Sequence, residues 1–384
     1  MRTPTPRGPL TTALLDVLAQ PPVAVEGRST PTGGEGAHAT AQHATAQHAP
    51  AGSPAGGTSA GATHAAGLLA AARTAVAATD DVLGDDDIQL ALFLLYELHY
   101  RGIDGVDEAW EWSPELIAAR GVLEAAFEQA VRVLVPVPAS ADGATTAAKV
   151  AEALFELTEA DDGPSVSTFV AKRATDAQLR EFVVHRSIYH LREADPHSWA
   201  LPRLSGRAKS ALIEIQADEY GGGRPGHIHA ELFAGTMRAL DLDDAYGAYL
   251  DAVGAHTLAN VNLMSLFGLH RRLRGAIVGH LAAFEMTSSI PCRKYGNGFR
   301  RLGYGPDVTF YFDEHVEADA VHEQIAGRDL AGGLVEAEPG LRHDVLWGAA
   351  AYLAVDGLAG AQMLQAWQAG RSALRSAAAV LDVA

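Results

Sequence analysis

Cysteine is nearly absent from the sequence, which has only Cys292 among its 384 residues. A single cysteine allows no disulfide within the chain and no thiolate metal cluster, so a metal site would need His, Asp and Glu. Long apolar runs are also missing, and without one of 18 or more residues we expect no transmembrane helix. The N-terminal stretch LTTALLDVLAQ is short and contains Asp16, which favours a weak local helix over a signal peptide. We therefore expect a cytoplasmic protein.

Basic residues are scarce relative to acidic ones. The chain has 29 Lys and Arg against 47 Asp and Glu, and its formal net charge is −18. This charge argues against nucleic acid or an anionic membrane as the main partner. Hydrophobic residues make up 48% of the chain, which is enough for a sizeable core. The length suits one large domain with a smaller one beside it, or a single elaborated helical domain.

Large apolar residues are almost missing between Val25 and residue 62. This part is rich in Ala, Gly, Thr, Pro and His, and AHATAQHATAQHAP repeats His38, His43 and His48 every five residues. Such a composition cannot bury enough apolar surface to offset its ordering entropy. We therefore predict a disordered tail over residues 1–62, with loose metal binding by the His repeat as the alternative.

The alternation typical of strands is scarce from residue 63 onward. Stretches such as DDDIQLALFLLYELHYRG are rich in Ala and Leu and begin with Asp, which a helix N-terminus favours. VRVLVPV alternates, but it is too isolated to build a sheet. We predict an all-α protein in which ADDGPS, near residue 162, separates a helical extension (63–162) from a second domain (163–384).

The stretch YFDEHVEADAVHEQ places His315, Asp319 and His322 on one helical stripe. At about 100° per residue, Asp319 lies about 40° from His315, and His322 lies about 20° away on the other side. If the stripe faces the core, its polar groups need partners, which favours a metal site. If it faces solvent, it is an ordinary acidic surface, and the pattern alone leaves this alternative open.

Other carboxylates and imidazoles precede this stripe, namely Glu193, Glu219, His227, His229 and Glu285. A non-haem iron pair in a helical bundle needs several such groups, pointing into the core from different helices. A ferritin-like bundle would need Glu-x-x-His on each of two helices. The sequence contains no Glu-x-x-His outside its N-terminal tail, which disfavours that type of bundle.

The late His-x-x-x-Asp-x-x-His, combined with EYGGG…HAELF and YHLREADPHSW, resembles the haem-oxygenase-like diiron oxidases. These proteins are often labelled iron-containing redox enzymes, and the similarity covers roughly residues 165–375. The resemblance implies a haem-oxygenase-like helical bundle whose pocket holds two Fe(II) ions, with O2 as co-substrate.

Carried over position by position, the resemblance implies seven metal ligands: Glu193, Glu219, His229, Glu285, His315, Asp319 and His322. Glu219 would bridge the two irons. Glu285 matches an additional carboxylate of the nitrogen-oxygenating branch, so we also expect it to be catalytic. Asp218 could replace Glu219, and His227 could replace His229. We prefer His229 because the family places its His directly before the xxLF pair.

The match at Glu285 favours an oxygenase that acts on the nitrogen of an amine or amino acid in specialised metabolism. Oxidative C–C or C–H cleavage of an amino or fatty acid at the same site is the alternative among enzymes. A non-catalytic helical binding or dimerisation protein is the alternative from another class. The resemblance also implies that residues 63–162 mediate a homodimer, and it leaves room for an external electron donor.

Overall fold

The computed structural model describes residues 1–22, 60–160, 163 and 165–375, without the side chains of residues 60–66 and 317–320. These residues form helices and no strand, so the predicted all-α fold is confirmed. The α-helices are α1 (Pro9–Leu18), α2 (Ala60–Ala78), α3 (Asp86–Glu97), α4 (Pro114–Leu134), α5 (Ala147–Glu159), α6 (Val166–Lys172), α7 (Asp176–His190), α8 (Asp195–Ser198), α9 (Gly206–Glu219), α10 (His229–Ala239), α11 (Ala255–Leu269), α12 (Arg274–Met286), α13 (Ser289–Arg301), α14 (Pro306–Gln324), α15 (Gly332–Ala337) and α16 (Arg342–Gln368).

Shorter helical segments connect these elements. A π-helical segment, η7 (Ile325–Ala331), joins α14 to α15. The 3-10 turns are η1 (Glu108–Trp112), η2 (Ala139–Asp142), η3 (Leu201–Arg203), η4 (Gly221–Gly223), η5 (Leu250–Ala252), η6 (Arg271–Leu273) and η8 (Pro339–Leu341). In the described part of the chain, no helix is both long and apolar enough to cross a lipid bilayer.

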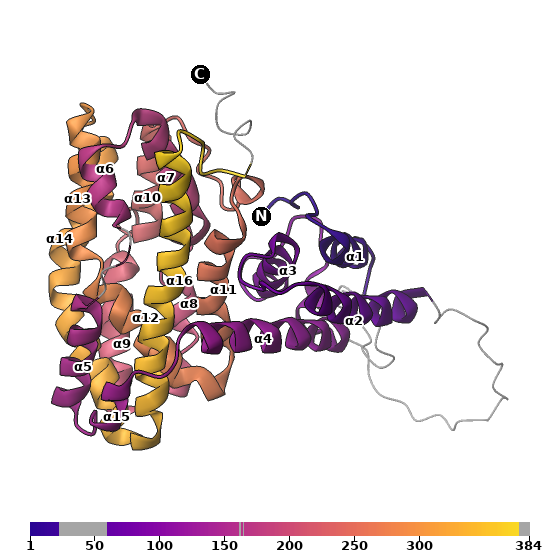
Figure 1. The fold of residues 1–384 in the computed structure, drawn as a ribbon, viewed down its shortest axis with the longest axis horizontal. Coiled ribbons are helices and arrows are strands. Elements are labelled where there is room, and N and C mark those ends of the chain that lie inside the picture. The colour runs from indigo at the N-terminus through magenta and orange to yellow at the C-terminus, as the bar shows by residue number, and fades with distance from the viewer. Residues whose placement is uncertain (23–59, 161–162, 164, 376–384) are drawn as a thin grey trace, which may run out of the picture.

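The helices form a large bundle with a smaller layer beside it (Figure 1). Helices α5 to α16 make up the bundle, in which α12 packs along α16 and α13 packs along α14. Helices α1 to α4 make up the smaller layer, and α3 packs against α11 of the bundle. The predicted extension over 63–162 is therefore divided, because α5 packs against α15, α16 and η7 rather than against the layer.

The predicted disordered tail is corrected for residues 1–22, which the structure describes as ordered. Leu10 and Leu14 of α1 are buried against the smaller layer, and α1 packs on α2 and α3. The carboxylate of Asp87 accepts hydrogen bonds from the backbone N–H groups of Leu10 and Thr11, each at 2.8 Å, which caps the start of α1. The local helix expected around Asp16 thus has an apolar face that tertiary packing covers. The His38, His43 and His48 repeat lies outside the described residues.

Two glycines allow α12 and α16 to approach very closely. A Cβ atom at Gly279 would lie 1.8 Å from the backbone oxygen of Val345, and one at Gly348 would lie 2.1 Å from that of Ala276. Any larger residue at either position would push the helices apart. This contact matters for the site because α12 carries Glu285, and α16 lines the main cavity of the bundle.

Candidate metal centre

A glycine-rich reversal brings the side chains of Glu219 and His229 together. Gly221, Gly222 and Gly223 have φ angles of +70°, +59° and +74°, in the left-handed region that glycine adopts easily. A Cβ atom at Gly221 would also lie 2.6 Å from the carbonyl carbon of His227. The chain therefore turns back between the last residue of α9 and the first residue of α10. Across this reversal, His229 Nδ1 lies 3.0 Å from Glu219 Oε2.

Glu193 lies in the turn between α7 and α8. The next residue, Ala194, has φ +72°, a backbone conformation that is unfavourable for any residue with a Cβ atom. Gln216 of α9 donates a hydrogen bond to the carbonyl oxygen of Ala194 at 2.9 Å and so supports this turn from inside. Strained backbone that persists because its surroundings hold it is concentrated at functional sites.

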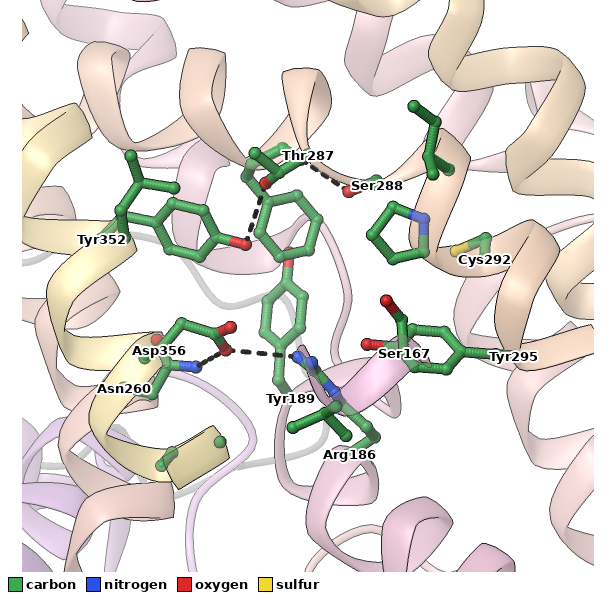
Figure 2. A pocket seen from close by; sticks show the side chains of 18 of the residues that line it. Ser167, Arg186, Tyr189, Asn260, Thr287, Ser288, Cys292, Tyr295, Tyr352 and Asp356 are labelled. Carbon is green, nitrogen blue, oxygen red and sulfur yellow. Dashed lines mark hydrogen bonds and ion pairs between the residues drawn. The ribbon is translucent and has the colours of Figure 1, made fainter. Parts of the chain in front are cut away.

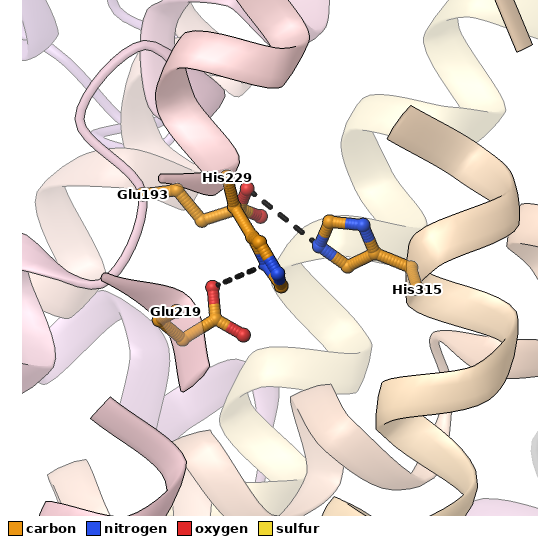
Figure 3. A group of neighbouring side chains, drawn as sticks. All are labelled: Glu193, Glu219, His229 and His315. Carbon is orange, nitrogen blue, oxygen red and sulfur yellow. Dashed lines mark ion pairs between the residues drawn. The ribbon is translucent and has the colours of Figure 1, made fainter. Parts of the chain in front are cut away.

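His315 reaches the same place from α14, and Tyr311 one turn earlier supports both partners (Figure 3 shows Glu193 and His315). The Tyr311 hydroxyl donates to Glu193 Oε1 and Oε2, at 3.0 and 2.8 Å. His315 Nδ1 lies 2.8 Å from the backbone oxygen of Tyr311. Because a carbonyl only accepts, Nδ1 carries the proton and Nε2 has its lone pair free for a ligand bond. His315 Nε2 lies 3.7 Å from Glu193 Oε2.

The buried side chains form two groups that share one carboxylate. Glu193, Glu219, His229 and His315 each offer a ligand atom within 4.8 Å of the others, and Glu219, Glu285 and His322 form a second group of the same kind. In the second group, His322 Nδ1 lies 3.4 Å from Glu285 Oε2. All six residues are at most 7% exposed. Glu219 therefore lies between two potential metal positions.

The electrostatics of the site favour an ionised Glu219 beside imidazoles, whereas burial raises the pKa of Glu285. Burial acts to raise the pKa of Glu219, but the surrounding imidazoles, His229 first, lower it to about 2. Burial lowers the pKa of His315 to about 4, and the neighbouring His229 contributes in the same direction. Burial also acts to lower the pKa of His322, but Glu285 outweighs it and raises the pKa to about 10. A cation between these carboxylates would supply the positive charge that His322 carries here.

The residues present fit a bound metal ion. Glu219 Oε2, His229 Nδ1 and His315 Nε2 are buried and form no hydrogen bond of acceptable geometry with any described residue. Glu219 Oε2 and His229 Nδ1 lie 3.0 Å from each other as an ion pair. Buried polar atoms need well-placed partners, and metal coordination would provide one for each of the three. Carboxylates and imidazoles without thiolates suit non-haem iron.

Comparison with known proteins shows what the region around this site is similar to. A family model described as "Iron-containing redox enzyme" matches residues 180–357. Residues 180–357 are therefore similar to the iron-containing redox enzymes. The chain is also 26% identical over 179 residues to nitrosourea synthase of Streptomyces achromogenes subsp. streptozoticus. That alignment covers 46% of this chain and 38% of the nitrosourea synthase, so the chain spans well under half of its relative.

The region similar to the iron-containing redox enzymes includes every candidate ligand predicted from the sequence. The structure brings Glu193, Glu219, His229, Glu285, His315 and His322 together, and the side chain of Asp319 lies outside the described residues. The alternatives are less suitable. His227 is exposed, and the side chain of Asp218 is 61% exposed and accepts a hydrogen bond from His322 Nε2 at 3.0 Å. The ligand roles themselves stay predictions.

Sequence reasoning missed the aromatic wall beside the centre. A cavity of about 590 Å³ in the bundle is lined in part by Tyr189, His190, Phe233, Phe284 and Tyr311 (Figure 2 shows Tyr189). His190 Nε2 lies 3.9 Å from Glu193 Oε1, so the side chain of His190 separates the cavity from this candidate ligand. In a sequence, aromatic residues at helical spacing look the same whether they fill the core or line a cavity. The sequence pattern therefore did not indicate this aromatic wall.

Proposed function

We propose that the chain is a non-haem diiron oxygenase that uses O2 to oxidise the nitrogen of an amine or amino acid. The observation that carries the proposal is the sharing of Glu219 by two groups of buried ligand atoms, the arrangement that two neighbouring metal ions need. The similarity to the iron-containing redox enzymes supports iron dependence and redox chemistry at a coarser level. The two-iron stoichiometry, the substrate, a homodimer and an external electron donor are parts of the proposal.

The position of Glu285 favours nitrogen as the site of oxidation. Glu285 is 3% exposed and joins His322 in the second ligand group. A carboxylate there takes a place that an acid substrate would otherwise use on the metal, which makes oxidative cleavage of an acid the weaker reading. The relative that carries the name nitrosourea synthase supports the same choice.

The rival reading as a non-catalytic binding protein needs the late histidine stripe to face solvent. His315 and His322 are instead 3% and 1% exposed, and both point into the bundle among carboxylates. Burying two imidazoles beside three acidic side chains is unfavourable unless a cation or protons compensate the charge. A catalytic or structural metal explains this cost, whereas a plain helical interface does not.

Iron bound here would supply electrons to O2 and act as a Lewis acid. The chain's own contribution is to orient the ligands and exclude water. Tyr311 holds both oxygens of Glu193, and its backbone oxygen fixes the tautomer of His315. Phe233 and Phe284 give the adjoining cavity an apolar wall, which keeps bulk solvent away from the reacting groups.

Anaerobic loading with Fe(II), followed by measurement of bound iron per chain, tests the proposal. Wild type should retain about two irons, as expected for two linked sites. Glu219→Ala should lose both irons, because both groups need this carboxylate. His315→Ala should retain about one iron, in the group of Glu285 and His322, because each iron depends on its own terminal imidazole.

His227→Ala is the matched control, since His227 is exposed and lies two residues from His229. It should load iron like wild type. Full iron retention by Glu219→Ala would contradict the shared carboxylate, and one iron in wild type would contradict the diiron reading. Loaded protein should also consume O2 faster when an amine or amino acid substrate is added, whereas stimulation by carboxylic acids alone would favour oxidative cleavage.

A further inference from the structure

The cavity beside the candidate metal centre contains a charged cluster that the centre does not use. Arg186 of α7, Asn260 of α11 and Asp356 of α16 lie together in its wall (Figure 2). Asn260 Nδ2 donates to Asp356 Oδ1 at 2.9 Å, whereas the Arg186 guanidinium is 3.5 Å from the same oxygen. The side chains of Arg186 and Asp356 keep 25% and 31% of their surface exposed, and both face the cavity.

The cluster has unused hydrogen-bonding capacity. Because Asn260 donates through Nδ2, its oxygen Oδ1 is available, and this buried oxygen has no hydrogen-bond partner among the described residues. Both contacts to Asp356 use Oδ1, and no described residue donates a hydrogen bond to Oδ2. The guanidinium of Arg186 has five N–H donors, more than its long contact with Asp356 and its interaction with the Tyr295 hydroxyl use. The cavity therefore presents two acceptors beside a cation.

A purely structural ion pair explains this arrangement poorly. A structural pair in a partly buried position gains most from short, bidentate contacts, yet the single contact between Arg186 and Asp356 is 3.5 Å long. Most of the neighbouring wall is apolar or aromatic, with Phe182, Phe284 and Met264 among its side chains. Charged groups in such a wall gain most when a ligand of complementary charge binds them.

The cluster lies at a defined distance from the candidate metal centre. Arg186 and His190 are one turn apart on α7, and Glu193 follows in the next turn. At 1.5 Å per helical residue, Arg186 and His190 are about 6 Å apart along α7, and Glu193 lies three residues beyond the end of this helix. Tyr189 and His190 line the cavity between Arg186 and Glu193. A ligand whose charged end lies at Arg186 would therefore extend along an aromatic wall toward the metal ligands.

We propose that Arg186, Asn260 and Asp356 form a head-group site for a zwitterionic α-amino acid. Arg186 binds the α-carboxylate, while Asp356 and the Asn260 side-chain oxygen accept hydrogen bonds from the α-ammonium. The side chain extends past Tyr189 toward Glu193, so the atom that reacts is remote from the head group. This direction rests on the proposed function of the metal centre, and the head-group site can be tested without it.

Three probes of similar length separate the charges of the head group. L-Norleucine carries both charges, hexanoate lacks the ammonium, and pentylamine lacks the carboxylate. Calorimetric titration of the full chain before iron loading should show norleucine binding at least about tenfold more tightly than either analogue, because each analogue leaves a charged group of the protein unpaired. Equal affinity for norleucine and hexanoate would overturn the proposal.

Variants assign each charge to its residue. Asp356→Asn should remove the preference for norleucine over hexanoate, and Arg186→Met should remove the preference for norleucine over pentylamine. Lys294→Met is the matched control, since Lys294 also lines the cavity but bonds to Thr168 at 3.0 Å. It should leave all three affinities unchanged. If Arg186→Met fails to fold, the nearly isosteric Asp356→Asn provides the test. If that variant still prefers norleucine over hexanoate as strongly as wild type does, the head-group site is refuted.

Iron loading of the same preparations separates this inference from the proposed function. Norleucine binding without iron uptake would refute the diiron centre and leave the head-group site standing. Uptake of about two irons without a norleucine preference would refute the head-group site and leave the diiron centre standing.

Discussion

Arg192 and Glu97 form an ion pair in which neither side chain is more than 1% exposed, with 3.2 Å between Nη1 and Oε2. The Tyr246 hydroxyl donates a second hydrogen bond to the same oxygen of Glu97 at 2.6 Å. Glu97 ends α3 of the smaller layer, while Arg192 directly precedes the candidate ligand Glu193. A buried charge pair thus joins the layer to the turn that carries the candidate ligand Glu193.

Replacing Glu97 by Gln should lower the free energy of unfolding by about 3–5 kcal/mol, because it leaves the Arg192 guanidinium buried without a counter-charge. Denaturant titration followed by circular dichroism measures this change. The exposed pair of Arg238 and Asp244 provides the control, and Asp244→Asn should cost less than about 1 kcal/mol. The double variant Glu97→Gln, Arg192→Met should recover part of the loss, and a strictly additive loss would contradict the coupling of the two charges.

Tyr311→Phe should weaken iron binding by about 10- to 100-fold, as loss of a hydrogen bond to a metal ligand commonly does. The variant removes the donor to both Glu193 oxygens but keeps the ring and the backbone oxygen that His315 contacts. Competition with a chelator of known affinity measures the change. Tyr304→Phe is the control, because its hydroxyl bonds to Asp176 at an exposed position. Equal affinity in Tyr311→Phe and wild type would show that Glu193 needs no such support.

His185 should make folding less favourable in acid. Burial lowers the pKa of His185 to about 4 from 6.5, and its Nδ1 lies 2.8 Å from the Thr257 hydroxyl. Between these two pH values the unfolded chain binds the proton and the folded chain does not. The contribution of His185 to the stability of the fold is therefore present above pH 6.5 and is lost as the pH falls toward 4, by roughly 3 kcal/mol.

His185→Gln should accordingly show a shallower fall in unfolding free energy between pH 7 and pH 4 than wild type. His343→Gln is the control, because the side chain of His343 is 40% exposed and pairs with Asp142 at the surface. Parallel pH profiles for wild type and His185→Gln would mean that His185 is protonated in the folded protein.

Leu14→Ala should lower the free energy of unfolding by about 2–5 kcal/mol, the usual cost of removing a fully buried leucine side chain. Leu14 of α1 is 0% exposed and belongs to the main hydrophobic cluster. Asp16 is exposed on the same helix, so Asp16→Ala should have little effect. A neutral Leu14→Ala variant would mean that α1 contributes nothing to the stability of the smaller layer.

Helical spacing and residue chemistry made much of this protein predictable. The stripe on α14 follows from 3.6 residues per turn, and both His315 and His322 point into the bundle as the metal hypothesis required. The motif EYGGG also places three glycines between Glu219 and His229, and the structure has positive φ angles there. These features depend on a few consecutive residues, and backbone geometry relates such residues directly.

Contacts between distant segments were decided only by the tertiary structure. Sequence patterns do not reveal that Glu219 is shared between the groups of His315 and His322, or that Asp356 lies beside Arg186, 170 residues away. They also suggested a disordered start to the chain, because the apolar face of α1 is too short to be stable alone and depends on burial against α2 and α3. Such contacts depend on how whole helices pack against one another. The free energy of packing depends on both contacting surfaces, so it cannot be read from the sequence of either segment alone.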